Sequence, residues 1–99
     1  MKNNNIEYKA RAIIGGLRNT VTDVLQGTRP KVQYIHFWRG IKRKLVETLE
    51  EALELREELP ADLIRKLETS RRILDRYPRP VNSDSMAISE ELQEKVLGD

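Results

Sequence analysis

The stretch that decides the fold is Tyr34-Ile35-His36-Phe37-Trp38-Arg39-Gly40-Ile41-Lys42-Arg43-Lys44-Leu45, together with its continuation to Leu59. Apolar residues recur in it at steps of three and four, with two polar members on the same stripe: Tyr34, Trp38, Ile41, Leu45, Thr48, Leu49, Ala52, Arg56 and Leu59. This spacing is typical of one face of an α-helix. It predicts a long helix from about Pro30 to Leu59, because proline suits the first turn of a helix. Pro60 either ends this helix or starts the next one.

The preceding segment, from about Asn5 to Gln26, carries a second stripe, made of Ile6, Ala10, Ile13, Ile14, Leu17, Val21, Val24 and Leu25. Apolar and polar residues also alternate from Ile6 to Ile14, as they would in a half-buried strand before Gly15-Gly16. The helical spacing continues past the glycines and the alternation does not, so we expect a helix. Gly27 then follows where a helix C-cap favours a residue without a Cβ.

The C-terminal part predicts two shorter helices. Heptad spacing indicates a helix from about Ala61 to Tyr77, ended by Pro78-Arg79-Pro80, through Leu63, Leu67, Ser70, Leu74 and Tyr77. Residues 81–88 are expected to be a linker, after which Ser89 caps a short acidic helix. The sequence therefore predicts an all-α protein, an antiparallel bundle of three long helices plus a short C-terminal helix. Residues 1–80 form the bundle domain, and residues 81–99 form the linker and the short acidic helix.

Composition limits the classes of protein to consider. Ninety-nine residues make one domain, and 38% hydrophobic against 34% charged residues suits long helices with one apolar stripe. Part of such a stripe needs a second chain to cover it, so we expect a homodimer. The chain has no cysteine, which excludes disulfides and zinc–cysteine sites. No stretch approaches the roughly 18 apolar residues of a membrane span, and we expect a cytoplasmic protein without membrane contact.

Charge is distributed unevenly along the chain. Residues 1–44 carry a net charge of +8, residues 45–60 of −5, residues 61–80 of +3 and residues 81–99 of −4. The long central helix is therefore basic first and acidic second, which opposes the helix dipole. We expect Arg65 and Lys66 to lie beside Glu54–Glu58, and Arg71 and Arg72 beside Glu47–Glu51. The positive charge of the basic half must be balanced by another group. The candidates are the acidic tail, an antiparallel second copy, an acidic protein partner and a phosphate backbone.

Catalysis by this chain is not expected. His36 is the only histidine, no phosphate-binding glycine loop occurs, and nothing in the pattern indicates a cofactor or a metal. The sequence favours a small non-enzymatic helical adaptor or regulatory protein that binds another protein. The alternative is a nucleic-acid-binding protein that uses the basic face of residues 29–44. The candidate contact residues for either partner are Arg11, Arg18, Lys31, His36, Arg39, Lys42, Arg43 and Lys44.

Overall fold

The structure is a computed structural model that describes residues 4–27, 32–55, 59–81 and 83–98. Its helices are α1 (Asn4–Gln26), α2 (Val32–Leu55), α3 (Ala61–Asp75) and α4 (Asp84–Leu92), and α4 continues into the π-helical turn η1 (Gln93–Leu97). The described residues contain no strand. The all-α prediction is confirmed, and the N-terminal segment is helical through Gly15-Gly16.

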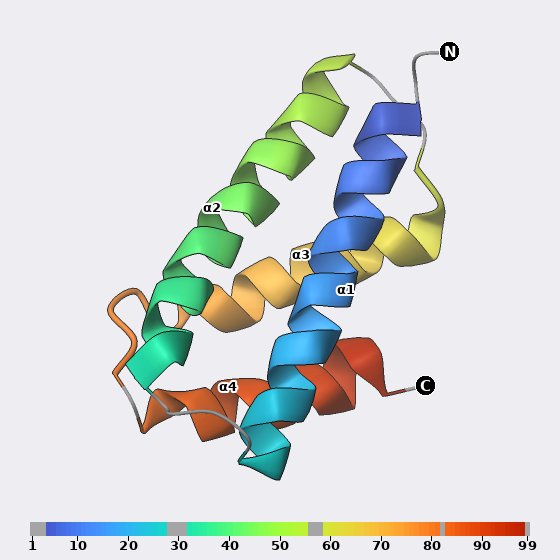
Figure 1. Ribbon diagram of the computed structural model, residues 1–99. Helices are drawn as coiled ribbons and strands as arrows, with labels where there is room; N and C mark the ends of the chain where they lie inside the picture. Colours follow the sequence, from blue (N-terminus) through green and yellow to red (C-terminus); the bar gives the residue numbers. More distant parts are fainter. Residues whose placement is uncertain (1–3, 28–31, 56–58, 82, 99) are drawn as a thin grey trace.

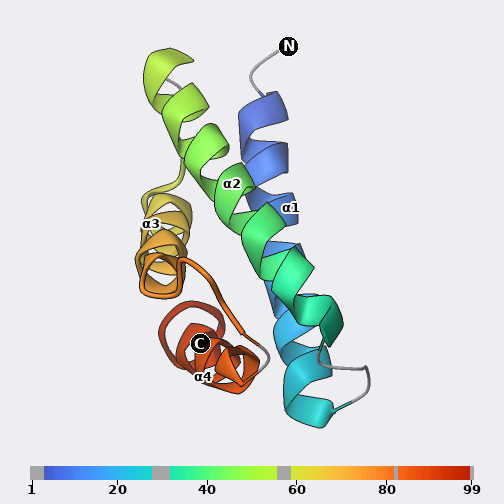
Figure 2. The ribbon, with the colours of Figure 1, turned by 90° about the vertical axis from the view of Figure 1, so that its left-hand side faces the viewer.

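The helices form two layers that cross each other. Antiparallel α1 and α2 make one layer, and α3 and α4 make the other (Figure 1). Turned by 90°, the view runs nearly along α3 and α4 while α1 and α2 lie lengthwise, so the layers cross steeply (Figure 2). Both α3 and α4 pack against α1, and α3 also packs against α2. One long side of α2 therefore faces away from the bundle.

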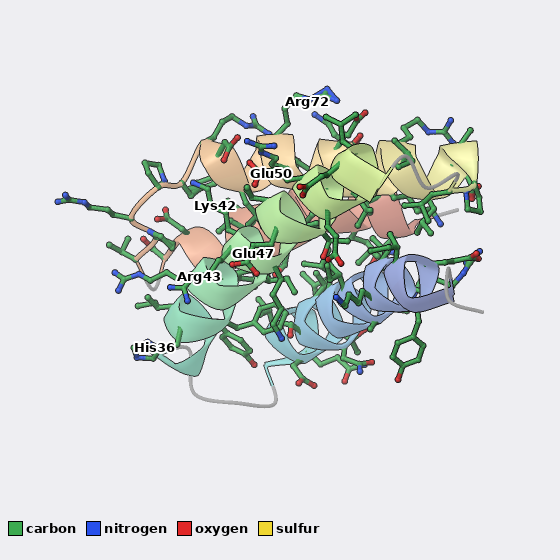
Figure 3. The ribbon with its side chains drawn as sticks, turned by 90° about the horizontal axis from the view of Figure 1, so that it is seen from above. His36, Lys42, Arg43, Glu47, Glu50 and Arg72 are labelled. Atoms are coloured by element: carbon green, nitrogen blue, oxygen red, sulfur yellow. The ribbon has the colours of Figure 1, made fainter. Side chains whose placement is uncertain are left out.

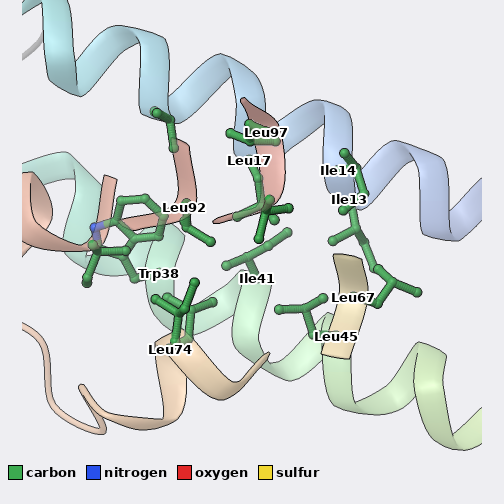
Figure 4. Close-up of a cluster of buried hydrophobic side chains, with 14 of the residues drawn as sticks. Ile13, Ile14, Leu17, Trp38, Ile41, Leu45, Leu67, Leu74, Leu92 and Leu97 are labelled. Atoms are coloured by element: carbon green, nitrogen blue, oxygen red, sulfur yellow. The ribbon is translucent and has the colours of Figure 1, made fainter. Parts of the chain in front are cut away.

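A single cluster of buried side chains joins the two layers (Figure 4). Of the stripe predicted for α2, Tyr34, Trp38, Ile41 and Leu45 belong to it, with Trp38 at 1% exposure and Leu45 fully buried, and Leu49 packs against it. The predicted extension to Leu59 is not confirmed: Arg56 lies outside the described residues, and Leu59 lies beyond the end of α2 and is not helical. The indole N–H of Trp38 donates to Ser85 Oγ at 3.0 Å. The Phe37 ring meets the Trp38 ring edge-on, with 5.3 Å between the centroids. The residues labelled in the close-up are Ile13, Ile14, Leu17, Trp38, Ile41, Leu45, Leu67, Leu74, Leu92 and Leu97.

The helix ends follow the sequence signals in two places. Gly27 has φ +66°, a left-handed conformation that favours glycine, and its N–H donates to the Val24 carbonyl at 3.2 Å. Pro60 stands at the N-cap of α3, where its carbonyl accepts from the N–H groups of Leu63 and Ile64. Pro30, where the second helix was expected to begin, lies outside the described residues.

The predicted linker at residues 81–88 is wrong, because α4 begins at Asp84. The Val81 N–H donates to Asp84 Oδ2 at 2.8 Å, and the Asp84 N–H donates to the Val81 carbonyl at 2.9 Å. Ser89, predicted as an N-cap, is fully buried inside the helix. The polar run before Met86 resembles a turn because the same residue types also start helices. The contact between Ser85 and Trp38 joins residues far apart in the sequence, so the local pattern does not reveal it.

Candidate interaction surfaces around α2

Half of the candidate contact residues remain free on the surface of α2. His36, Arg39, Arg43 and Lys44 are all exposed, and Figure 3 shows His36 and Arg43 on the outer side of the helix. In the described part of the chain, none of the four lies within ion-pair distance of a carboxylate. Their exposed position agrees with the helical phase expected from the sequence.

The other candidates are used within the fold or lie elsewhere. Lys42 Nζ lies 3.2 Å from Asp75 Oδ1 of α3, and Arg11 pairs with Glu7 of its own helix at 2.7 Å. Arg18 reaches the Leu97 carbonyl at 3.5 Å. Lys31 lies outside the described residues. The structure therefore does not gather the eight candidates into one basic surface.

The glutamates of α2 are not neutralised by α3 as expected. Glu51 pairs with Lys9 of α1 at 3.2 Å, and Arg71 pairs with Asp75 of its own helix at 3.9 Å. In the described ranges Glu47, Glu50 and Glu54 make no ion pair. The reason is the steep crossing of α3, which leaves Arg72 and Glu50 on the two walls of one hollow (Figure 3).

The ion pairs of the acidic tail, over the residues that the structure describes, are made near the end of α3 and within the tail, and not with the basic residues of α2. Glu91 accepts hydrogen bonds from Arg76 of the α3–α4 connection and from Lys95 one turn later. The Arg76 hydrogen bond, and then that of Lys95, hold the pKa of Glu91 below its usual range. The Asp84 carboxylate accepts from the Val81 N–H just before its own helix. Within the described ranges, the carboxylates of the tail therefore form no ion pair with His36, Arg39, Arg43 or Lys44.

A groove of about 440 Å³ runs between α1 and α2. Its apolar part includes the half-buried Phe37, whose ring is left uncovered by Gly16; a Cβ at Gly16 would touch that ring at 3.9 Å. Tyr8 stands at the edge of the groove with 75% of its surface exposed. The lining residues are Tyr8, Lys9, Ala12, Ile13, Gly16, Phe37, Ile41, Lys44, Glu47, Thr48 and Glu51.

Sequence reasoning missed Tyr8 and Ala12 as surface residues. Both were assigned to the rival strand pattern, and neither belongs to the helical stripe of α1. Their four-residue spacing with Gly16 was the available signal, because it places all three on one edge of a helix. Their exposure follows from the position of α2 across the groove, which a single sequence does not give.

A second, more open hollow of about 810 Å³ lies between α2 and α3. Leu53 borders it with 80% of its surface exposed, the highest value among the exposed large apolar residues described. The wall on α3 is mainly charged. The lining residues are Leu49, Glu50, Ala52, Leu53, Ile64, Glu68, Arg71, Arg72 and Asp75.

Neither hollow contains a recognisable catalytic arrangement. His36 lines neither of them, and the described residues include no group of three or more His, Cys, Asp or Glu that could hold a metal ion. None of the helices over the described ranges is long and apolar enough to cross a membrane. Comparisons with protein-family models, curated proteins and solved structures find no match.

Proposed function

We propose that this protein is a small non-enzymatic adaptor or regulator that binds another protein in the α1–α2 groove. The observation that carries the proposal is Tyr8, three-quarters exposed beside an apolar groove that includes Phe37 and Ile41. Tyrosine is among the residue types that contribute most binding energy at protein interfaces. An apolar groove with a few convergent polar groups is also the usual form of a binding site.

The groove suits an amphipathic helix or a similar segment of the partner. Gly16 and Ala12 let a partner approach α1 closely, and Phe37 offers a ring for an apolar anchor. The rim carries both signs of charge: Lys9 and Glu51 pair with each other, whereas Lys44 and Glu47 make no ion pair among the described residues. A partner segment with apolar anchors on one face and mixed charges beside them would match this surface.

Site-specific photocrosslinking tests the proposal. A photoreactive phenylalanine analogue replaces Tyr8 in cells that make the protein, and the same analogue at exposed Glu94 serves as the control. We expect a protein adduct of defined mass from position 8 that position 94 does not give. Equal adducts from both positions, or an adduct removed by nuclease rather than by protease, would contradict the proposal.

Nucleic-acid binding is the second candidate function. It is favoured by the exposure of His36, Arg39, Arg43 and Lys44 without a carboxylate partner in the described ranges. It is opposed by Glu47, Glu50 and Glu54, which continue the same helix and would repel phosphates. Fluorescence anisotropy with duplex and single-stranded probes across a salt series measures it. Micromolar binding that falls steeply with salt, and is lost in an Arg39→Glu/Arg43→Glu variant, would establish this function.

The predicted homodimer would use a different side of α2 from the groove. A cytoplasmic location stays a prediction from the sequence.

A further inference from the structure

The outward face of α2 carries charges of both signs that the described fold does not neutralise. Arg39 and Arg43 lie in its N-terminal half, Glu50 and Glu54 in its C-terminal half, and all four are exposed. None of them has an opposite charge within ion-pair distance in the described part of the chain. This order also opposes the helix dipole. A partner that offers both signs in the reverse order would balance the helix.

One edge of α2 combines these charges with apolar surface. Arg39, Arg43, Val46, Glu50 and Leu53 follow one another at steps of four and three residues, so they lie along one line of the helix. Val46 is half-buried at the centre, and Leu53 is 80% exposed near the end. We call this line the α2 seam. An apolar centre flanked by complementary charges is typical of a helix–helix contact.

We propose that a second copy of this chain packs antiparallel on the α2 seam, with the two α2 helices meeting at Val46. Arg43 precedes Val46 by three residues and Glu50 follows it by four, so each Arg43 lies within one residue, or about 1.5 Å along the helix axis, of Glu50 of the other copy. Arg39 then lies level with Leu53 and Glu54 of that copy. Its aliphatic stem covers the exposed leucine while its guanidinium meets the carboxylate. Twofold symmetry makes every contact twice.

The charge order favours this occupant over the others. A parallel pair would place Arg43 on Arg43 and Glu50 on Glu50. A nucleic acid would pair with the arginines but would be repelled by the glutamates. The antiparallel copy satisfies both halves of α2 at once. The seam borders the α2–α3 hollow, so the dimer would leave the α1–α2 groove of each copy open.

Sedimentation equilibrium over a concentration series, combined with a charge exchange, tests the dimer. The wild-type mass is expected to rise from 11.5 kDa toward twice that value. Arg43→Glu alone and Glu50→Arg alone each bring like charges together at both symmetric contacts, and should weaken the dimer at least about tenfold. An equimolar mixture of the two variants should dimerise again, because each contact then joins opposite charges.

The same charge changes elsewhere provide matched controls. Arg65→Glu on α3 and Glu94→Arg on η1 alter exposed residues outside the seam and should leave dimerisation unchanged. Circular dichroism checks that each variant stays helical. If a charge reversal unfolds the chain, Arg43→Gln and Glu50→Gln replace it. Each removes the interchain ion pairs without bringing like charges together, and should weaken the dimer by a smaller factor.

Three results would overturn the proposal. They are a wild-type protein that stays monomeric up to about millimolar concentration, a dimer that Arg43→Glu does not weaken, and a mixture of the reversed variants that stays monomeric. Tyr8 lies outside the seam, so none of these results bears on partner binding in the α1–α2 groove.

Discussion

At the scale of single residues, one buried hydrogen bond ties the start of α4 to α2. Trp38 is the only tryptophan, and its indole N–H donates to Ser85 Oγ in the core. Two other buried serine hydroxyls, those of Ser70 and Ser89, have no hydrogen-bond partner among the described residues. The burial of Trp38 could be predicted from its place on the α2 stripe. Its bond to Ser85 could not, because the sequence around Ser85 suggested a linker.

Two serine substitutions separate the value of this bond from the effect of losing a hydroxyl. Ser85→Ala leaves a buried indole N–H without an acceptor and should lower the free energy of unfolding by about 1–3 kcal/mol. Ser70→Ala removes a hydroxyl that bonds to nothing described and should change stability by less than about 0.5 kcal/mol. Urea unfolding followed by Trp38 fluorescence measures both. Equal losses in the two variants would show that the Trp38–Ser85 bond contributes nothing special.

A second effect at the residue scale concerns pH. Arg76, followed by Lys95, lowers the pKa of Glu91, so the folded state holds this carboxylate ionised at a pH where the unfolded chain binds a proton. The stabilisation is therefore complete above the ordinary glutamate pKa of about 4.5, and is lost as the pH falls through the lowered value. Glu91→Gln should be less stable at pH 7 and lose less stability on acidification than wild type.

Urea unfolding at several pH values between neutral and about pH 3 makes this measurement. The matched control is Glu90→Gln, because Glu90 is exposed next to Glu91 and makes no ion pair in the described chain. It should keep the wild-type dependence on pH. A Glu91→Gln protein with the wild-type dependence on pH would show that the Arg76–Glu91 contact does not contribute to the change of stability with pH.

At the scale of elements, helical periodicity predicted the phase of α2 and the existence of α1, α2 and α3. It worked because each of these helices buries an apolar stripe, such as the one through Trp38 and Leu45. At the end of α1 the stripe was wrong by one residue, because Leu25 is 41% exposed while Val24 is buried. It failed for the start of α4, where helix-capping residues resemble a turn. It also did not give the crossing of α3, since the packing angle depends on side-chain shapes at contacts far apart in the sequence.

Two leucines of α2 test its phase. Leu45→Ala removes a fully buried side chain and should cost about 2–5 kcal/mol of stability. Leu53→Ala truncates a side chain that is 80% exposed, so the stability of the monomer should change by less than about 0.5 kcal/mol. Thermal and urea unfolding at a low protein concentration compare them. A large loss in Leu53→Ala and a small one in Leu45→Ala would place the wrong face of α2 in the core.

At the scale of the whole molecule, the two crossed layers leave α2 with a groove on its α1 side and a charged seam on its α3 side. The candidate contact residues predicted from the sequence fall into two groups, those that stay exposed and those that form ion pairs within the fold. Arg39 and Arg43 stay on the surface, whereas Lys42 and Arg11 pair within the fold. Net charge by segment could identify a basic half of α2. It could not show which cations form ion pairs within the fold, because that depends on where Asp75 and Glu7 lie.

The central claim is that the protein works by binding another protein in the α1–α2 groove. The most direct test is the dissociation constant of the ligand that crosslinks from position 8, measured for wild type, Ala12→Arg and Ala87→Arg. Both alanines are exposed on helices, but Ala12 lines the groove and Ala87 lies on α4. We predict that Ala12→Arg, still folded, binds at least about tenfold more weakly, while Ala87→Arg binds as wild type does. Unchanged or tighter binding by Ala12→Arg, as expected for a nucleic acid attracted to one more cation, would contradict the claim.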